Sequence, residues 1–224
     1  MRGAICLKAA CGAANLSPFR LIHTEPAVNS RLIKPYISSA MEEKTVGFQG
    51  IQGAYSESAA EGLFRSSQHL KHVRPIFKGY QTFNQTFEAL KKREIDYAII
   101  PIENSSTGTF LWNFDLMHNF DAHIVGEYCI HESHCLVALP GVKIEDLKEI
   151  RSHPYVIDQC QLFLSDAGKH LSVSQALDTA GSASYIKEKN LKDVGAIAGK
   201  KAAEIYGLSI LKENVEDKQN TITR

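Results

Sequence analysis

The sequence predicts an α/β protein of two lobes, with helices covering mixed sheets and a ligand-binding cleft between the lobes. From Thr45 onwards, short apolar runs alternate with helical patterns, which is typical of a sheet covered by helices. Two extended segments, 123–128 and 134–139, follow one another in mid-chain, as expected where a chain crosses between lobes. Polar segments also recur where predicted strands give way to helices, which is where open α/β sheets bind ligands.

The first half of the chain is predicted to form three strand–helix units. Segment 97–102 is short, apolar and rich in β-branched residues, as suits a strand buried on both faces. Phe83, Phe87 and Leu90 recur at the spacing of an amphipathic helix. The predicted strands are 45–50, 73–77 and 97–102, and the predicted helices are 53–64, 82–92 and 112–118.

The second half continues the alternation. Pro154 fits the first turn of a helix, and Gly207 marks a helix end. The predicted helices are 144–150, 154–167, 178–189 and 200–206, and the predicted strands are 123–128, 134–139, 171–175, 194–198 and 209–215, with an extended run from 219. We assign 45–122 and 209–224 to lobe 1, and 123–208 to lobe 2.

Residues 1–40 differ in composition from the rest of the chain. They carry five basic residues and one acidic residue, are rich in Ala and Ser, and contain no long apolar stretch. This composition is typical of an organelle transit peptide rather than a secretory signal. A disordered leader, or a true start at Met41, is the alternative. Residues 1–44 are therefore treated as a leader outside the predicted fold.

The remaining composition bears on the class of protein. The 25 basic residues balance the 25 acidic ones, so no nucleic-acid-binding surface is indicated. No stretch reaches the roughly 18 consecutive apolar residues of a membrane-spanning helix. The five cysteines are an odd number without a framework spacing, which favours reduced thiols in an intracellular compartment.

Several residues with reactive or ligating side chains are predicted to be structural. His134 and Cys135 are adjacent on a predicted strand and point in opposite directions, so with His131 they do not predict a metal site. Cys160 lacks a paired His at a motif spacing, which favours a core thiol. Trp112 is also expected in the core rather than at a ligand.

Four polar segments stand between a predicted strand and a predicted helix start. They are Gly50–Ser56, Glu103–Thr109, Arg151–Pro154 and Asp178–Ser182. Helix N-termini present unpaired N–H groups and a partial positive charge, so they hold carboxylates well. We expect the segments to meet at the cleft and to bind a small organic acid. Ordinary helix capping is the alternative explanation for any one of them.

The motifs within and around these segments resemble the prephenate and arogenate dehydratases of phenylalanine biosynthesis. The resemblance runs from Thr45 to Arg224, and the motifs stand in the family's order. They are Gly53–Glu57, Pro101–Ser105, His123–Glu127, His134–Gly141, Ser152–Pro154 with Gln159–Cys160, Asp178–Ala180, Ala202–Leu208 and Thr223–Arg224. The resemblance implies a two-lobed fold like that of type 2 periplasmic binding proteins, with 45–224 as the catalytic domain and the active site between the lobes.

The resemblance also implies a reaction. Prephenate would lose water and carbon dioxide to give phenylpyruvate, or arogenate would do so to give phenylalanine, without a metal or an organic cofactor. Thr223 would assist the departing hydroxyl, while Glu103 and Gln159 orient the substrate or the threonine. The implied substrate-binding residues are Asn104, Ser105, Ser152, Thr179, Tyr55 and Ser56. The implied partners are the small-molecule substrate and further copies of the chain, with no nucleic acid and no membrane.

The sequence departs from the family pattern at its end. The family motif continues past Arg224 with Phe and a further strand, it has Asn where Thr221 stands, and an ACT-type regulatory domain follows in most members. We therefore expect the natural protein to be longer and this chain to be poorly active. An organic-acid-binding module without catalysis, or an inactive fragment on the same fold, is the alternative.

The leader also bears on location and substrate. If it is a transit peptide, it predicts a plastid and favours arogenate over prephenate. If it is not, the cytoplasm is the predicted location.

Overall fold

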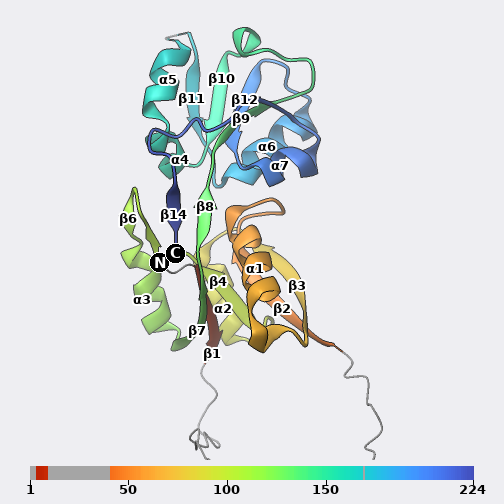
Figure 1. Cartoon of the computed structure of the whole chain (residues 1–224), viewed down its shortest axis with the longest axis vertical. Helices are drawn as coiled ribbons and strands as arrows, with labels where there is room; N and C mark the ends of the chain where they lie inside the picture. Colours follow the sequence, from red (N-terminus) through yellow and green to blue (C-terminus); the bar gives the residue numbers. More distant parts are fainter. Residues whose placement is uncertain (1–3, 10–40, 169) are drawn as a thin grey trace, which may run out of the picture.

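The computed structural model describes residues 4–9, 41–168 and 170–224, and shows two α/β lobes joined by a small third sheet (Figure 1). This confirms the predicted fold class of two lobes built from mixed sheets and helices. In the part of the chain that the structure describes, no helix combines the length and apolar character of a membrane-crossing segment. The transit-peptide prediction lies mostly outside the described residues.

Lobe 1 is built on a five-stranded sheet in the order β3-β2-β4-β1-β7. Strand β2 runs parallel to β3 and β4, whereas β1 runs antiparallel to β4 and β7. Its strands are β1 (Ala4–Ala9), β2 (Glu42–Gln49), β3 (Val73–Tyr80), β4 (Tyr97–Ile100) and β7 (Ala122–Tyr128), and its helices are α1 (Tyr55–Ser66), η1 (Gln68–Leu70), α2 (Phe83–Lys91) and α3 (Leu111–Asn119).

Both faces of the lobe 1 sheet are covered because side chains alternate along β4. Ile99 packs in one buried cluster with Leu63 and Phe64 of α1. Its neighbour Ile100 belongs to a second cluster, which includes Phe87 of α2 and Leu116 of α3. Successive strand residues point to opposite faces, so one strand anchors helices on both sides. The prediction that this apolar, β-branched segment forms a strand buried on both faces is therefore confirmed.

Lobe 2 has the same plan around a sheet in the order β11-β10-β12-β9-β13. Helices α6 and α7 cover one face, and α4 and α5 cover the other. Its strands are β9 (Cys135–Ala138), β10 (Glu149–Ser152), β11 (Ser172–Gln175), β12 (Val194–Ala198) and β13 (Ser209–Lys212), and its helices are η2 (Ile144–Asp146), α4 (Pro154–Gln159), α5 (Gln161–Ala167), α6 (Thr179–Lys189) and α7 (Lys200–Tyr206). Strands β10, β11 and β12 are parallel, and β9 is antiparallel to both of its neighbours.

A four-stranded antiparallel sheet joins the lobes in the order β6-β5-β14-β8. Its strands are β5 (Glu103–Asn104), β6 (Gly108–Thr109), β8 (Ile130–Glu132) and β14 (Thr221–Thr223). Strands β8 and β14 are the two chain segments that run between the lobes, and they lie side by side (Figure 1). We call this the hinge sheet. It brings the end of the chain back to the polar loop that follows β4.

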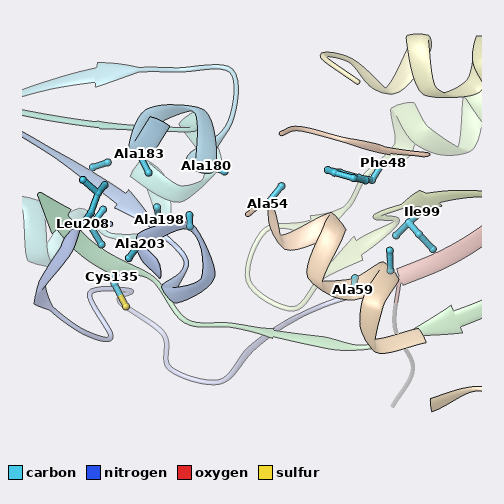
Figure 2. Close-up of a cluster of buried hydrophobic side chains, with 14 of the residues drawn as sticks. Phe48, Ala54, Ala59, Ile99, Cys135, Ala180, Ala183, Ala198, Ala203 and Leu208 are labelled. Atoms are coloured by element: carbon cyan, nitrogen blue, oxygen red, sulfur yellow. The ribbon is translucent and has the colours of Figure 1, made fainter. Parts of the chain in front are cut away.

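The lobes also touch through a buried apolar cluster and an ion pair. Figure 2 shows cluster members from lobe 1 (Phe48, Ala54, Ala59, Ile99) and from lobe 2 (Cys135, Ala180, Ala183, Ala198, Ala203, Leu208). At the contact, a Cβ added to Gly53 would lie 3.0 Å from the Cα of Ala202 in α7. Beside it, the Lys201 ammonium lies 2.9 Å from Glu57 and 2.8 Å from Glu61, both on α1. The start of α7 therefore contacts both α1 and the turn that precedes it.

The structure corrects three sequence-based assignments. Segment 144–150 was expected to be one helix but contains the short η2 and the start of β10, a central strand. The spacing of Ile144, Leu147 and Ile150 suits a helix, and β10 is too short for its alternation to outweigh that pattern. Strand β13 pairs with β9 in lobe 2, and β7 pairs with β1 in lobe 1, so 209–212 and 123–128 belong to the opposite lobes from those predicted.

The third correction concerns the leader. Residues Ala4–Ala9, which were left out of the predicted fold, form strand β1 between β4 and β7. Leu7 is fully buried in the cluster beneath α2 and α3. A single short apolar segment among basic and small residues gave no periodic signal for this pairing, because strand partners are set by the tertiary fold.

Candidate active site

A cleft of about 680 Å³ lies between the lobes and is bounded by the hinge sheet. All four polar segments predicted from the sequence contribute to it: Ala54, Tyr55 and Ser56 from the first, Asn104, Thr107 and Thr109 from the second, His153 from the third, and Asp178 and Thr179 from the fourth. Of the described side chains around the cleft, the acidic ones are Glu132 and Asp178, and none is Lys or Arg. The prediction of converging loops is confirmed.

The register of the hinge sheet places three polar side chains together. Thr223 of β14 lies directly opposite Asn104 of β5. On its other side β14 pairs with β8, where Thr221 lies opposite Glu132. Residues two apart on a strand share a face, so Glu132 is the diagonal neighbour of Thr223. Three separate regions of the sequence therefore meet at one face of a small sheet.

The hydroxyl of Thr223 has a hydrogen-bond partner on each side. The Asn104 side-chain amide donates to Thr223 Oγ1 at 2.8 Å. The Thr223 hydroxyl donates to Glu132 Oε1 at 2.7 Å, and Asn104 also donates to Glu132 Oε2 at 3.3 Å. All three side chains line the cleft.

Asn104 is held in one orientation by its own loop. Its side-chain oxygen accepts hydrogen bonds from the backbone N–H groups of Ser106 at 2.8 Å and Thr107 at 2.9 Å. Asn commonly closes turns in this way. Because the oxygen is occupied, the NH₂ end must face Thr223 and Glu132. The turn and the site are thus built by the same side chain.

Burial raises the pKa of the Glu132 carboxyl above its usual range, against the opposing effects of the Thr223 hydrogen bond and of His134 nearby. A carboxyl in this environment takes up a proton more readily than one in water. The cleft therefore contains an acid beside the Thr223 hydroxyl that holds its proton to a higher pH than an ordinary glutamate.

A second chain of hydrogen bonds crosses from lobe 1 to lobe 2. The Tyr55 hydroxyl lies 2.8 Å from His134 Nδ1 and donates to the carbonyl of Ser133 at 2.8 Å. His134 Nε2 lies 2.7 Å from Gln159 Oε1. With a partner on each ring nitrogen, the fully buried His134 fixes both Tyr55 and Gln159 at the cleft wall. Burial raises the pKa of the Tyr55 phenol well above its usual value, so Tyr55 remains a neutral donor.

His153 is the imidazole on the lobe 2 wall of the cleft. It is the N-cap of α4, and its Nδ1 accepts from the backbone N–H of Tyr155 at 3.3 Å. Burial lowers the pKa of His153, and the Asp178 carboxylate partly offsets that effect. The neutral ring then carries its proton on Nε2, where it can act as a hydrogen-bond donor.

Aromatic side chains form the rest of the wall. The rings of Phe110 in lobe 1 and Tyr155 in lobe 2 meet edge to face, with centroids 5.8 Å apart. Trp112 also lines the cleft and is 69% exposed, so the prediction that it belongs to the core was wrong. It stands in the first turn of α3 next to Leu111, which is also exposed and also lines the cleft. Cys160, by contrast, is fully buried, as predicted.

Six of the nine predicted site residues line the cleft: Thr223, Gln159, Asn104, Thr179, Tyr55 and Ser56. The other three lie elsewhere. Glu103 points away from the cleft and faces the Arg224 guanidinium at 3.5 Å, because neighbours on a strand point to opposite faces and Asn104 takes the inner one. Ser105 accepts from the backbone N–H of Ile222, and Ser152 is buried and donates to the carbonyl of Ile197.

Two polar residues at the centre of the cleft, Glu132 and His153, were not singled out from the sequence. Glu132 lies in a three-residue strand that the predicted elements did not include. The signal that could have identified it is its distance of two positions from His134, which indicates a shared face on an extended chain. His153 stood inside a predicted segment but was not singled out. Among the described residues, no cluster of three or more His, Cys, Asp or Glu side chains is arranged to hold a metal ion.

Comparison with known families identifies the family of the chain. A family model described as prephenate dehydratase matches residues 46–224, which includes every strand of the hinge sheet. The chain belongs to the prephenate dehydratase family. The resemblance read from the motifs is thereby confirmed.

Curated relatives with sequences similar to this chain include arogenate dehydratases of plants. It is 42% identical over 180 residues to arogenate dehydratase 2 of Petunia hybrida, covering 80% of this chain and 43% of that protein. It is 39% identical over 201 residues to arogenate dehydratase/prephenate dehydratase 2, chloroplastic, of Arabidopsis thaliana, covering 86% of this chain and 50% of that protein. The chain thus spans about half the length of these relatives.

Solved structures share the fold. One is prephenate dehydratase in complex with L-Phe from Arthrobacter aurescens, with a TM-score of 0.65 and 27% identity over 80% of this chain and 58% of that one. Another is GqqA, described as a novel type of quorum quenching acylase, with a TM-score of 0.66 and 32% identity over 80% of this chain and 62% of that one.

Proposed function

We propose that this chain carries the active site of a dehydratase that removes water and carbon dioxide from prephenate or arogenate. The observation that carries the proposal is the Thr223 hydroxyl, which Asn104 holds within an interlobe cleft lined by the predicted segments. Membership of the prephenate dehydratase family supports it. The relatives' names support both substrates as candidates.

The reaction requires little from the protein beyond positioning of the substrate and donation of one proton. When the C1 carboxylate leaves as carbon dioxide, its bonding pair enters the ring, and the C4 hydroxyl leaves with the pair of the C–O bond. Because the ring becomes aromatic, the substrate itself supplies the driving force of the reaction. The protein has to hold the substrate still and protonate the departing hydroxyl. Thr223 is the proposed donor to that oxygen, while Gln159, fixed through His134, orients the substrate.

The carboxylates of the substrate are proposed to lie near the N-terminus of α1. The N-cap residue Ala54 makes no side-chain cap, and it lines the cleft with Tyr55 and Ser56. An uncapped helix N-terminus offers N–H groups and a partial positive charge to an anion. Thr179, at the start of α6, faces the cleft from lobe 2. Neutral donors of this kind bind a carboxylate without the cost of burying a Lys or Arg.

The same proposal extends to location and assembly. A plastid location is supported by the chloroplastic relative. Association of copies of this chain is supported by β7, the edge strand of the lobe 1 sheet, where Ile124 and Val125 are more than half exposed. Light scattering of the purified protein tests association, and imaging of the full chain fused to a fluorescent protein tests location.

The test is a side-by-side assay of prephenate and arogenate with the purified protein and two variants. Thr223→Val is expected to lower kcat by about 10²-fold or more, because general acid catalysis contributes 10²–10⁴-fold. Thr223→Ser is expected to retain more activity, since it keeps the hydroxyl. Thr221→Val is the matched control, because Thr221 is equally buried on the same strand but donates to the carbonyl of Lys218.

Turnover of neither substrate by the unaltered protein would refute the proposed function. Full turnover by Thr223→Val would refute the role of the hydroxyl.

A further inference from the structure

We propose that Glu132 is the proton store of this site, and that it supplies the proton which Thr223 passes to the departing hydroxyl. The inference rests on the proposed function and adds to it a group for which the family resemblance gave no role. In this proposal Glu132 acts through Thr223 rather than on the substrate.

The hydrogen bonds at Thr223 depend on whether Glu132 carries a proton. The Thr223 hydroxyl can accept two hydrogen bonds and donate one. Asn104 fills one acceptor position. If Glu132 is ionised, it accepts the only hydrogen of Thr223, and none remains for a ligand in the cleft. If Glu132 is protonated, it donates to the second acceptor position, and the hydrogen of Thr223 is free to point at the substrate.

One of the two Glu132 carboxyl oxygens is free to carry the proton. Asn104 donates to Oε2, so that oxygen is an acceptor. The proton therefore belongs on Oε1, which lies 2.7 Å from Thr223 Oγ1. This is within the range of an O–H···O hydrogen bond. The protonated carboxyl, the Thr223 hydroxyl and the cleft thus form one continuous path.

The groups that face Glu132 come from the elements packed against it. On β14 and β5 its neighbours are the uncharged Thr223 and Asn104. From α1 and the start of β9, the titratable groups that interact with it are the Tyr55 phenol and the His134 imidazole. The nearby cation Arg224 is directed to Glu103 and Glu127 instead. Burial raises the pKa of Glu132, and the protonated form is thereby favoured over a wider pH range.

The proposed step balances in atoms and charge. The Glu132 O–H bond breaks as a new O–H bond forms on Thr223, and the original Thr223 hydrogen moves to the departing hydroxyl, which leaves as water. The electron pair of the broken C–O bond goes with that water. The pair of the C1–carboxylate bond completes the aromatic ring as carbon dioxide leaves. Glu132 ends as a carboxylate and regains its proton from solvent before the next turnover.

The experiment compares the pH profiles of kcat for the unaltered protein, Glu132→Gln and Glu132→Asp. Gln has the shape of Glu and can still donate a hydrogen bond to Thr223, but it has no proton to lose. The unaltered protein is expected to lose activity as pH rises through the raised pKa of Glu132. Glu132→Gln is expected to show a kcat lower by about 10²-fold and to lack that alkaline fall. Glu132→Asp is expected to keep a pH-dependent fall. Glu88→Gln, on the exposed face of α2, is the control and should match the unaltered protein.

The outcomes separate the two proposals. If the unaltered protein turns over either substrate and Glu132→Gln keeps its kcat, the role of Glu132 is refuted while the proposed function stands. A reduced kcat with an unchanged alkaline fall would also refute it, because Glu132 would then only shape the site. If neither substrate is turned over by the unaltered protein, the proposed function fails and this inference fails with it.

Discussion

The side-chain amide of Asn104 donates a 2.8 Å hydrogen bond to the hydroxyl of Thr223, although 119 positions separate the two residues in the sequence. The bond is possible because β5 and β14 are neighbours in the hinge sheet and the two residues are directly paired. The same amide closes the loop after β4 through its oxygen. One buried side chain thus links the geometry of the loop, the end of the chain and the cleft.

Replacement of Asn104 by Ala should affect both stability and turnover. It leaves the backbone N–H groups of Ser106 and Thr107 without their acceptor and removes a donor from Thr223. We expect a loss of about 1–3 kcal/mol in the free energy of unfolding, the usual cost of unsatisfied buried polar groups. We also expect kcat to fall by about 10²-fold, as when a reacting group is misplaced. Urea unfolding and the dehydratase assay measure the two effects.

The control for the stability part of this prediction is Asn84→Ala, because Asn84 also lines the cleft. Asn84 is exposed on α2 and donates one side-chain hydrogen bond, to Glu88. Its replacement should change stability by less than about 0.5 kcal/mol, as is usual for surface positions. Equal losses in the free energy of unfolding for both variants would show that Asn104 has no special role in stability.

Tyr55→Phe should destabilise the contact between the lobes. The substitution leaves His134 Nδ1 and the Ser133 carbonyl without the phenol. We expect a loss of about 1–3 kcal/mol in the free energy of unfolding at neutral pH. The raised pKa of Tyr55 adds a pH dependence. The folded protein favours the neutral phenol, so the unaltered protein loses stability as pH rises above the phenol's ordinary value. Tyr55→Phe should lose less over that range.

A phenol outside the cleft provides the comparison. Tyr185 lies beneath the Arg151 guanidinium, 4.5 Å from its ring centroid, and does not line the interlobe cleft. Tyr185→Phe keeps the ring and removes only a phenol outside the cleft, so it separates loss of the Tyr55 contacts from the general effect of a Tyr-to-Phe change. If Tyr55→Phe follows the unaltered protein at every alkaline pH, the phenol is not the group responsible.

The periodic helices and strands of both lobes could be predicted from the sequence, but the hinge sheet could not. Helices and long strands can be recognised from repeated apolar spacing, such as that of Phe83, Phe87 and Leu90. Strands β5, β6, β8 and β14 have only two or three residues each, too few to show a period. Their pairing is set by where the lobes place them. Glu132 was missed for this reason, and the assignment of Thr223 came from the family resemblance rather than from any local pattern.

The polar loops were easier to predict than the direction of each side chain within them. Glu103 and Asn104 are adjacent in one loop and both were proposed for the site, yet a strand turns one inward and the other outward. Glu103 faces Arg224, whose own backbone N–H donates to the carbonyl of Glu103 at 2.6 Å. Glu103 thus anchors β14 beside the cleft. Which of two neighbours faces inward depends on register, and the register of a two-residue strand is fixed by its partners.

Glu132→Gln should also change the pH dependence of stability. Because the folded-state pKa of Glu132 is raised, the folded protein binds a proton there more tightly than the unfolded chain does. That contribution to stability is complete at low pH and is lost as pH rises through the folded-state pKa. Gln cannot ionise. The variant should therefore gain stability relative to the unaltered protein as pH increases, in urea unfolding series from about pH 4 to about pH 9. A constant difference across the series would mean that Glu132 ionises as it does in water.

Gly53→Ala tests the contact between the turn before α1 and helix α7. Gly53 has a φ of +93°, and an added Cβ would lie 3.0 Å from the Cα of Ala202 across the lobe interface. Two costs should add: about 1 kcal/mol for a side chain in the left-handed region, and a further 1–3 kcal/mol or so for overpacking against backbone that cannot yield. Gly141→Ala is the matched control, since Gly141 has a φ of +86° but open space where its Cβ would lie. The difference between the two losses of unfolding free energy isolates the packing term, and equal losses would show that the lobes separate readily at this contact.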